Sequence, residues 1–132
     1  MVRVLGWGPV ALWAAVLFLL SELQGAGGGL PAGVDKLVHG GLYFVLGLCF
    51  AWGKEKTGSS VPAVLLLFMG VGYGALDEWH QSFVPGRDVS VGDWVADSAG
   101  VIIGLVLFSS FSSRLRGNGR SPGEGTTTTG SA

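Results

Sequence analysis

The sequence predicts an all-α protein, a four-helix transmembrane bundle, and three observations lead to this prediction. The 132-residue chain is 48% hydrophobic and only 13% charged, whereas soluble domains carry about 25% charged residues. Its apolar residues form four runs with almost no charge, and each approaches the roughly 20 residues that a membrane span needs. Many of its 24 glycines lie within these runs, where small residues let membrane helices pack closely.

The first two runs predict helices at about 4–21 and 35–53. A signal peptide is the alternative for the first, because Arg3 precedes it. Its apolar stretch is longer than a usual signal core, and the following SELQGAGGG has no clean cleavage site of small residues. We therefore expect a retained helix, placed at the edge of the bundle because it carries no polar stripe. The second helix starts at the polar residues Asp35 and Lys36.

The third and fourth runs predict helices at about 62–81 and 93–111. Pro62 suits the first turn of the third helix, where its missing N–H costs nothing. The fourth run is uncharged except for Asp97, and a carboxylate at that depth must be protonated or paired with a cation. Arg87, Lys36 and His39 are the candidate partners.

The basic residues predict the orientation of the helices, and the composition predicts where the domain ends. The transmembrane domain is predicted to cover residues 1–111. The segment 112–132 that follows is rich in Gly, Ser and Thr, which predicts a disordered tail. Most basic residues fall at the N-terminus, in the second loop and after the fourth helix, which predicts that both termini are cytoplasmic. These residues are Arg3, Lys54, Lys56, Arg114, Arg116 and Arg120. The acidic first and third loops then face the outside.

Polar residues recur at helical spacing on one face of each of the last three helices. Residues three or four apart share a face, and each stripe passes from polar residues at the outer end to small ones deeper in the membrane. We expect the three helices to pack together, so that these polar ends line one pocket under the loop that carries Arg87. The stripes are Asp35, His39, Tyr43 and Gly47; Gly70, Gly74, Glu78 and Gln81; and Asp93, Asp97, Gly100 and Gly104.

Several of these residues allow two interpretations. Asp35 either caps its helix or orients His39 for acid–base chemistry, and one residue can do both. Arg87 either binds an anionic group of a ligand or forms a salt bridge with Asp88 or Asp93. His39 and Glu78 are the candidate catalytic residues.

The remaining ionisable residues, the cysteine and the net charge indicate no specific function. Asp77 and His80 are expected on the surface, and the single Cys49 as a small buried apolar residue. His39, His80, Glu78 and the aspartates show no metal-binding spacing, so we expect neither a metal nor a cofactor. The net charge of −1 gives no general attraction to nucleic acid.

Four short motifs in order make the sequence resemble the VanZ-like family of small bacterial membrane proteins. They are D-K-x-x-H, E-x-x-Q, P-G-R and D-x-x-x-D-x-x-G, and the similarity covers roughly residues 4–111. The residues concerned are Asp35, Lys36, His39, Glu78, Gln81, Arg87, Asp93, Asp97 and Gly100. The resemblance implies a multi-pass protein of the bacterial plasma membrane, and its namesake implies a role in tolerance to teicoplanin-type antibiotics.

Three functions fit these observations. The pocket could bind the head group of an anionic lipid or of a lipid-linked envelope precursor, with Arg87 and Lys36 on the anion. Alternatively, an enzyme could act on such a lipid, with His39 and Glu78 as acid and base. A purely structural role is the third, in which the charges pair with one another and hold the bundle closed.

Overall fold

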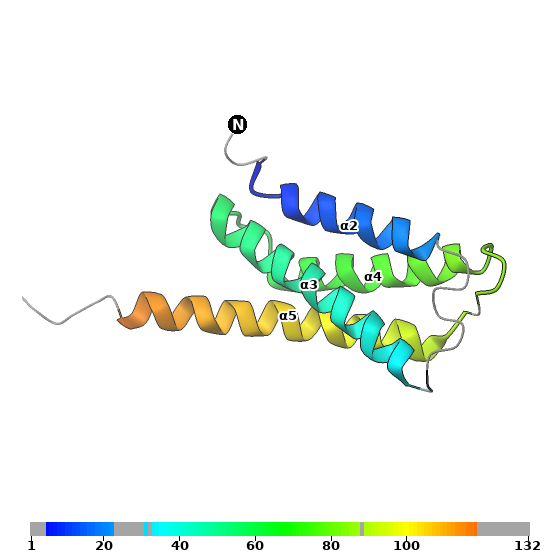
Figure 1. The fold of residues 1–132 in the computed structure, drawn as a ribbon. Coiled ribbons are helices and arrows are strands. Elements are labelled where there is room, and N and C mark those ends of the chain that lie inside the picture. The colour runs from blue at the N-terminus through cyan, green and yellow to red at the C-terminus, as the bar shows by residue number, and fades with distance from the viewer. Residues whose placement is uncertain (1–4, 23–30, 32, 88, 119–132) are drawn as a thin grey trace, which may run out of the picture.

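The computed structural model describes residues 5–22, 31, 33–87 and 89–118, and over these residues the chain is helical without strands. The elements are α2 (Gly8–Ser21), α3 (Val34–Thr57), α4 (Ala63–Gln81) and α5 (Val91–Asn118). Successive helices run in opposite directions (Figure 1), so the end of α4 lies beside the beginnings of α3 and α5. This architecture confirms the predicted all-α four-helix bundle.

The helix boundaries differ from the predicted ones mainly at the C-terminal ends of α3 and α5. α3 continues to Thr57, where Gly58 ends it in the left-handed conformation at φ 61°; glycine is the usual residue at such a terminus. α5 continues to Asn118, into the segment predicted to be disordered. Residues 119–132, the rest of that segment, lie outside the described residues.

The most extensive helix contact joins α3 to α5, and glycines make it possible. A Cβ atom at Gly100 would overlap the carbonyl oxygen of Gly40, and one at Gly104 would overlap that of Phe44. A Cβ atom at Gly47 would lie 2.5 Å from the carbonyl oxygen of Val101. The two backbones are therefore in direct contact, as in membrane helices that pack through small residues.

α2 is attached to α3 and α4 through hydrogen bonds to backbone carbonyl groups as well as through apolar packing. Trp13 Nε1 donates to the carbonyl oxygen of Leu42 over 2.8 Å, and the Tyr73 hydroxyl donates to that of Ala14 over 2.6 Å. All four helices contribute to the apolar core. Its buried members are Leu17, Tyr43, Leu46, Phe50, Ala51, Leu66, Val101 and Leu105.

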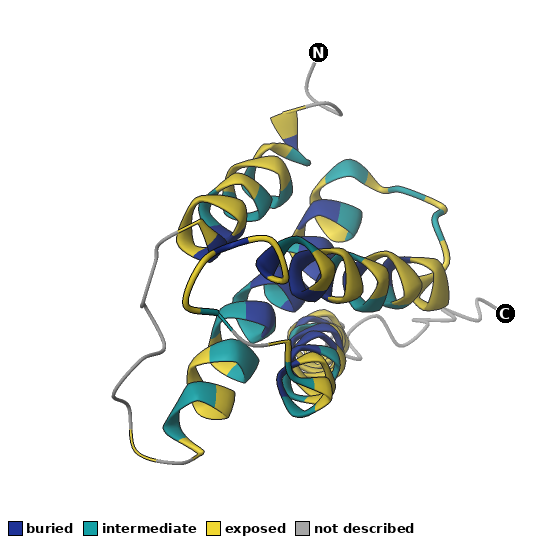
Figure 2. Cartoon of the chain, turned by 90° about the vertical axis from the view of Figure 1, so that its right-hand side faces the viewer, coloured by how far each residue is buried: buried dark blue, intermediate teal, exposed yellow. Residues whose placement is uncertain are grey.

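The outward surface of the bundle is strongly apolar, and Figure 2 shows the exposed residues on the outer sides of the helices. α3 and α5 are long and apolar enough to cross a membrane, yet only 28% and 33% of their apolar windows are buried in the protein. The core helix of a soluble protein would be mostly buried, and monomeric soluble proteins seldom expose large apolar patches. These two helices support association of the chain with a membrane.

Candidate functional site

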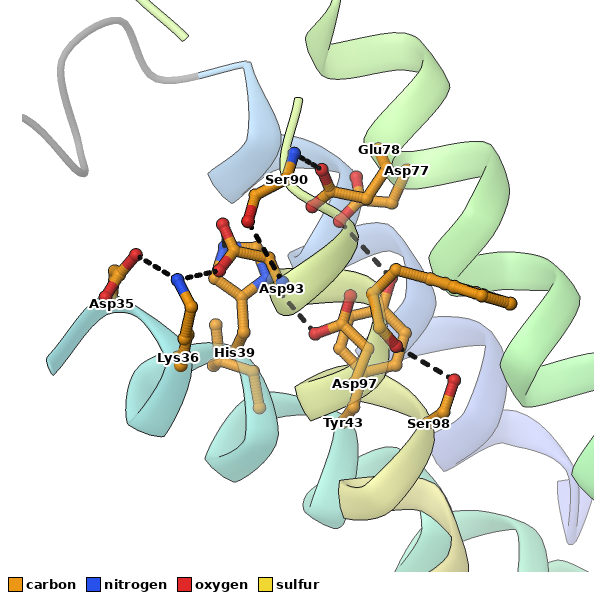
Figure 3. Close-up of polar contacts among 12 residues, drawn as sticks. Asp35, Lys36, His39, Tyr43, Asp77, Glu78, Ser90, Asp93, Asp97 and Ser98 are labelled. Atoms are coloured by element: carbon orange, nitrogen blue, oxygen red, sulfur yellow. Dashed lines mark hydrogen bonds and ion pairs between the residues drawn. The ribbon is translucent and has the colours of Figure 1, made fainter. Parts of the chain in front are cut away.

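His39 of α3 and Asp97 of α5 lie at the centre of a polar cluster at one end of the bundle (Figure 3). His39 Nδ1 is 3.1 Å from Asp97 Oδ1, and the side chain of Asp97 is 0% exposed. On the other ring nitrogen, Nε2 is 4.0 Å from Asp93 Oδ2. The close contact between Gly40 and Gly100 holds α3 and α5 near enough for this pairing. Asp97 was predicted to be protonated or paired with Arg87, Lys36 or His39, and of these three it contacts His39.

Asp35 has a different role from either of the two that the sequence suggested. α3 begins after Gly33, which adopts φ 93°, so Gly33 and not Asp35 is the N-cap residue. The Asp35 carboxylate instead lies in the first turn, accepts a hydrogen bond from Gly33 N over 3.1 Å and contacts Lys36. A carboxylate is favourable in a first turn because of the helix dipole. The carboxylate that contacts His39 belongs to Asp97, so the proposed pairing of Asp35 with His39 is wrong.

Lys36 bridges two carboxylates at the edge of the cluster. Its Nζ atom lies 3.1 Å from Asp35 Oδ2 and 3.1 Å from Asp93 Oδ1. The side chain of Lys36 is 46% exposed, and ion pairs of such exposed residues contribute little to stability. Lys36 thereby connects Asp35 to Asp93, whose carboxylate lies 4.0 Å from His39.

Glu78 connects the end of α4 to the beginning of α5. Its Oε2 atom accepts a hydrogen bond from the backbone N–H of Ser90 over 2.9 Å. The Ser90 hydroxyl in turn accepts one from the backbone N–H of Asp93 over 3.3 Å, which is the geometry of a serine that caps a helix. Glu78 is 4% exposed and Ser90 is partly buried, so this link holds the first turn of α5 beside the end of α4.

Asp77 was predicted to lie on the surface, but the structure places it in the buried cluster. The Tyr43 hydroxyl donates to Asp77 Oδ2 over 3.2 Å, and Gln81 Nε2 donates to the same oxygen over 3.4 Å. Asp77 is buried because it shares the inward face of α4 with Gln81, one turn further on. His80 lies outside this cluster and is partly exposed, where it pairs with Glu22 just after α2.

Arg87 enters the site through a tight turn after α4. Gly86 adopts φ 82°, and the N–H of Arg87 donates to the carbonyl oxygen of Val84 over 3.2 Å. A positive φ favours glycine, and it turns the chain so that Arg87 faces the bundle. The predicted salt bridge between Arg87 and Asp93 does not form. Its other candidate partner, Asp88, is not among the described residues.

A cavity of about 250 Å³ lies between α2, α3, the end of α4 and the Arg87 turn. Its wall combines apolar and polar side chains. Its lining consists of Leu17, Leu20, Ser21, Asp35, Val38, His39, Leu42, Tyr43, Asp77, Gln81 and Arg87. The participation of α2 was not predicted: a helix that is apolar on all sides gives no sign of which face turns inward.

Some buried polar atoms of the cluster have no hydrogen-bond partner among the described residues. They are Glu78 Oε1, Asp97 Oδ2 and Arg87 Nε. Such atoms are uncommon in folded proteins, because an unsatisfied buried group loses its hydration without compensation. In addition, His39, Glu78 and Asp97 each offer one potential metal-ligand atom, and these three atoms lie within 4.8 Å of one another. The arrangement can therefore bind a cation, or hold a proton between histidine and carboxylate.

Comparison with protein families identifies the chain over most of its length. The model of the VanZ/LLP1 family matches residues 7–112. The chain belongs to the VanZ/LLP1 family. This match confirms the family that the four motifs predicted, and it extends from just before α2 through most of α5.

This VanZ/LLP1 protein is also similar to an uncharacterized protein of Schizosaccharomyces pombe, C11E3.10. The two are 31% identical over 93 residues, which make up 70% of this chain and 57% of the yeast protein. The chain thus spans a little over half the length of that relative. No solved structure matches the chain. Because the relative is from yeast, family membership alone does not assign the chain to bacteria, and its bacterial origin stays a prediction.

Proposed function

We propose that this VanZ/LLP1 protein binds the phosphate-bearing head group of a membrane lipid, or of a lipid-linked envelope precursor, in the cavity between α2, α3 and α4. The observation that carries this proposal is the mixed apolar and polar chemistry of the cavity wall. Leu17, Leu20, Val38 and Leu42 provide apolar surface. The other lining residues provide hydrogen-bonding and charged groups. An amphiphilic ligand needs both kinds of surface in one site.

Arg87 is the residue that we propose to contact the phosphate. It is the arginine that lines the cavity, and a guanidinium group can give a phosphate two parallel hydrogen bonds. Lys36, the other cation considered for this role, is absent from the cavity lining and contacts Asp35 and Asp93 instead. Gln81 and Tyr43 are then suited to the neutral polar groups of the ligand.

We further propose that all four helices cross the membrane, with the cavity near the outer surface and both termini in the cytoplasm. Lys54, Lys56, Arg114 and Arg116 support this orientation. They lie near the ends of α3 and α5, which are opposite to the helix ends around the cavity (Figure 1). Basic residues near membrane helices favour the cytoplasmic side.

Mass spectrometry of lipids bound to the purified protein tests the proposed ligand class. We expect co-purification of phosphate-bearing lipids, and stronger binding of phosphatidylglycerol or phosphatidic acid than of diacylglycerol. Arg87→Ala should reduce this binding, and Arg87→Lys should restore part of it. Arg114→Ala is the matched control, because Arg114 is exposed in the last part of α5. Equal lipid binding by wild type and Arg87→Ala would contradict the proposal, and loss of stability without a change in lipid binding would favour the structural role.

An enzyme acting on a lipid-linked substrate is the second candidate function. The His39–Asp97 contact favours it, because a carboxylate that orients an imidazole is a common arrangement in general acid–base catalysis. His39→Gln and Glu78→Gln keep the side-chain size and remove ionisation. Loss of lipid conversion in both variants at unchanged membrane abundance would support an enzyme.

In a bacterial host, changed susceptibility to teicoplanin on expression of the protein would support the role in antibiotic tolerance that the family's namesake suggests.

A further inference from the structure

We propose that His39, Glu78 and Asp97 form a binding site for a divalent transition-metal ion such as Zn²⁺ or Mn²⁺. Each residue comes from a different helix, and together they bring one nitrogen and two carboxylate ligands to one point. The three potential ligand atoms lie within 4.8 Å of one another. With bonds of about 2.1 Å, ligand atoms of one octahedral ion are about 3.0 Å apart at neighbouring corners and about 4.2 Å apart at opposite corners. Closure around an ion therefore requires side-chain movements of up to about 2 Å.

Two carboxylate oxygens with no hydrogen-bond partner in the described part of the chain favour a cation-binding position. Asp97 is 0% exposed and Glu78 is 4% exposed, and the free atoms are Asp97 Oδ2 and Glu78 Oε1. A buried carboxylate is costly unless a donor or a cation compensates it. Figure 3 shows both carboxylates reaching into the space around His39 from α4 and α5.

The polar groups next to these oxygens already have other partners. Tyr43 and Gln81 donate to Asp77, and Ser90 N donates to the other oxygen of Glu78. Lys36 is engaged with Asp35 and Asp93 at the edge of the cluster. A cation held at the centre would use the two free oxygens at once, which no single one of these donors does.

The kinds of ligand indicate which ions fit the site. Imidazole nitrogen favours Zn²⁺ and other transition metals, and carboxylate oxygen suits Mn²⁺ and Mg²⁺ as well. A mixed set of one imidazole and two carboxylates therefore favours Zn²⁺ or Mn²⁺ over Ca²⁺. Three protein ligands leave at least one coordination position open. His39 also lines the cavity, so an open position toward the cavity could accept water or an anionic ligand.

Asp93 lies in the place where metal-binding histidines usually have a hydrogen-bonded carboxylate, and it must move closer to form that bond. Its Oδ2 atom lies 4.0 Å from His39 Nε2, while Nδ1 faces Asp97. A carboxylate beside the second ring nitrogen fixes the orientation of a ligating histidine. Lys36 and the Ser90 cap hold Asp93 in this position.

No metal site was predicted from the sequence because the ligands follow no linear motif. His39, Glu78 and Asp97 are far apart in the chain, and only the packing of three helices brings them together. The histidine that lies closest in sequence to Glu78 is His80, which pairs with Glu22 outside the cluster. Sequence spacing therefore suggests the wrong histidine as a partner for Glu78.

Metal binding by the purified full-length protein tests the site without any lipid assay. The protein is dialysed against a chelator, incubated with Zn²⁺, Mn²⁺ or Co²⁺, and separated from unbound ions before elemental analysis. We expect about one equivalent of bound metal and, with Co²⁺, visible absorption bands of a nitrogen- and oxygen-ligated ion. Less than about a tenth of an equivalent with every ion would overturn the proposal.

Substitutions then locate the bound ion. Asp97→Asn and Glu78→Gln keep the side-chain size and should weaken binding at least about tenfold, and Asp93→Asn should weaken it about 10–100-fold through the histidine. His80→Gln is the matched control and should bind the metal as wild type does. Unchanged affinity in Asp97→Asn and Glu78→Gln, or an equal loss in His80→Gln, would refute the site. Circular dichroism checks that each variant folds. If a variant does not fold, the Co²⁺ spectrum of the wild type tests the ligands instead: bands of a nitrogen- and oxygen-ligated ion support the site, and their absence contradicts it.

Discussion

The Tyr43 hydroxyl on α3 donates a hydrogen bond to Asp77 on α4 over 3.2 Å, and both side chains are buried. This contact connects two helices at the inner end of the cavity and gives the Asp77 carboxylate one of its two side-chain donors. The other donor, Gln81, lies on the same helix as Asp77. Tyr43 is therefore the residue through which α3 stabilises a buried negative charge on α4.

Tyr43→Phe should destabilise the protein, because it leaves the Asp77 carboxylate with a single side-chain donor. Loss of a partner from a buried charged group costs about 1–3 kcal/mol. The free energy of unfolding in detergent, measured by circular dichroism, gives this value. Tyr73→Phe is a suitable comparison: Tyr73 donates to the backbone carbonyl of Ala14, so its loss should cost less. An equal effect of the two substitutions would mean that the charge of Asp77 does not matter.

Gly100→Ala and Gly104→Ala should each separate α3 from α5. The added methyl group would overlap a backbone carbonyl oxygen, that of Gly40 or Phe44, and backbone cannot move aside as a side chain can. Overpacking of this kind costs about 1–3 kcal/mol. Gly72→Ala is the control, since nothing lies within 4 Å of the new Cβ atom, and alanine favours a helix by up to about 1 kcal/mol over glycine. The melting temperature should therefore fall in Gly100→Ala and Gly104→Ala and stay the same or rise in Gly72→Ala.

His39 and Asp97 should be energetically coupled. A double-mutant cycle with His39→Ala and Asp97→Ala is expected to give an interaction free energy of about 0.5–3 kcal/mol, as contacting buried residues do. The same cycle for Lys36 and Asp35 should give a smaller value, since that pair is more exposed to solvent. If the two cycles gave equal coupling, burial of Asp97 would not strengthen its interaction with the histidine.

The proposed orientation predicts which loops react with a membrane-impermeant thiol reagent added outside cells. In a background in which Cys49 is replaced by alanine, Phe83→Cys should be labelled in intact cells, because Phe83 is 68% exposed in the loop after α4. Ser60→Cys, between α3 and α4, should be labelled only after the cells are permeabilised. The reverse pattern would place the cavity on the cytoplasmic side.

Much of the fold could be predicted because apolar runs and stripes are local features of a sequence. The four helices appear where the runs lie, and the stripe on α4, with Gly70 and Glu78, is buried as expected. The ends of α3 and α5 were harder, since polar residues extend both helices beyond their apolar parts. The end of α3 depends on one glycine, Gly58, and not on the hydrophobic pattern.

The site was predicted less completely, for a reason of helix geometry. A strict spacing of four on α4 selects Gly70, Gly74 and Glu78 and leaves out Asp77. Asp77 nonetheless lies seven residues after Gly70, and an inward face of ordinary width includes both positions. The pairing of His39 with Asp97 rather than with Asp35 depends on the distance between α3 and α5, which no single helix encodes.

The backbone contact between α3 and α5 also limits how the cavity can enlarge. Glycines lie directly against carbonyl oxygens along this contact, so α3 and α5 have no room to slide or to approach each other. The two helices, and the His39–Asp97 pair between them, therefore behave as one rigid unit. A head group too bulky for the present volume would have to displace α2 or swing out the turn at Gly86. Selectivity for the size of the bound molecule would then reside in the N-terminal helix, whereas the charged centre behind it could remain the same for every ligand.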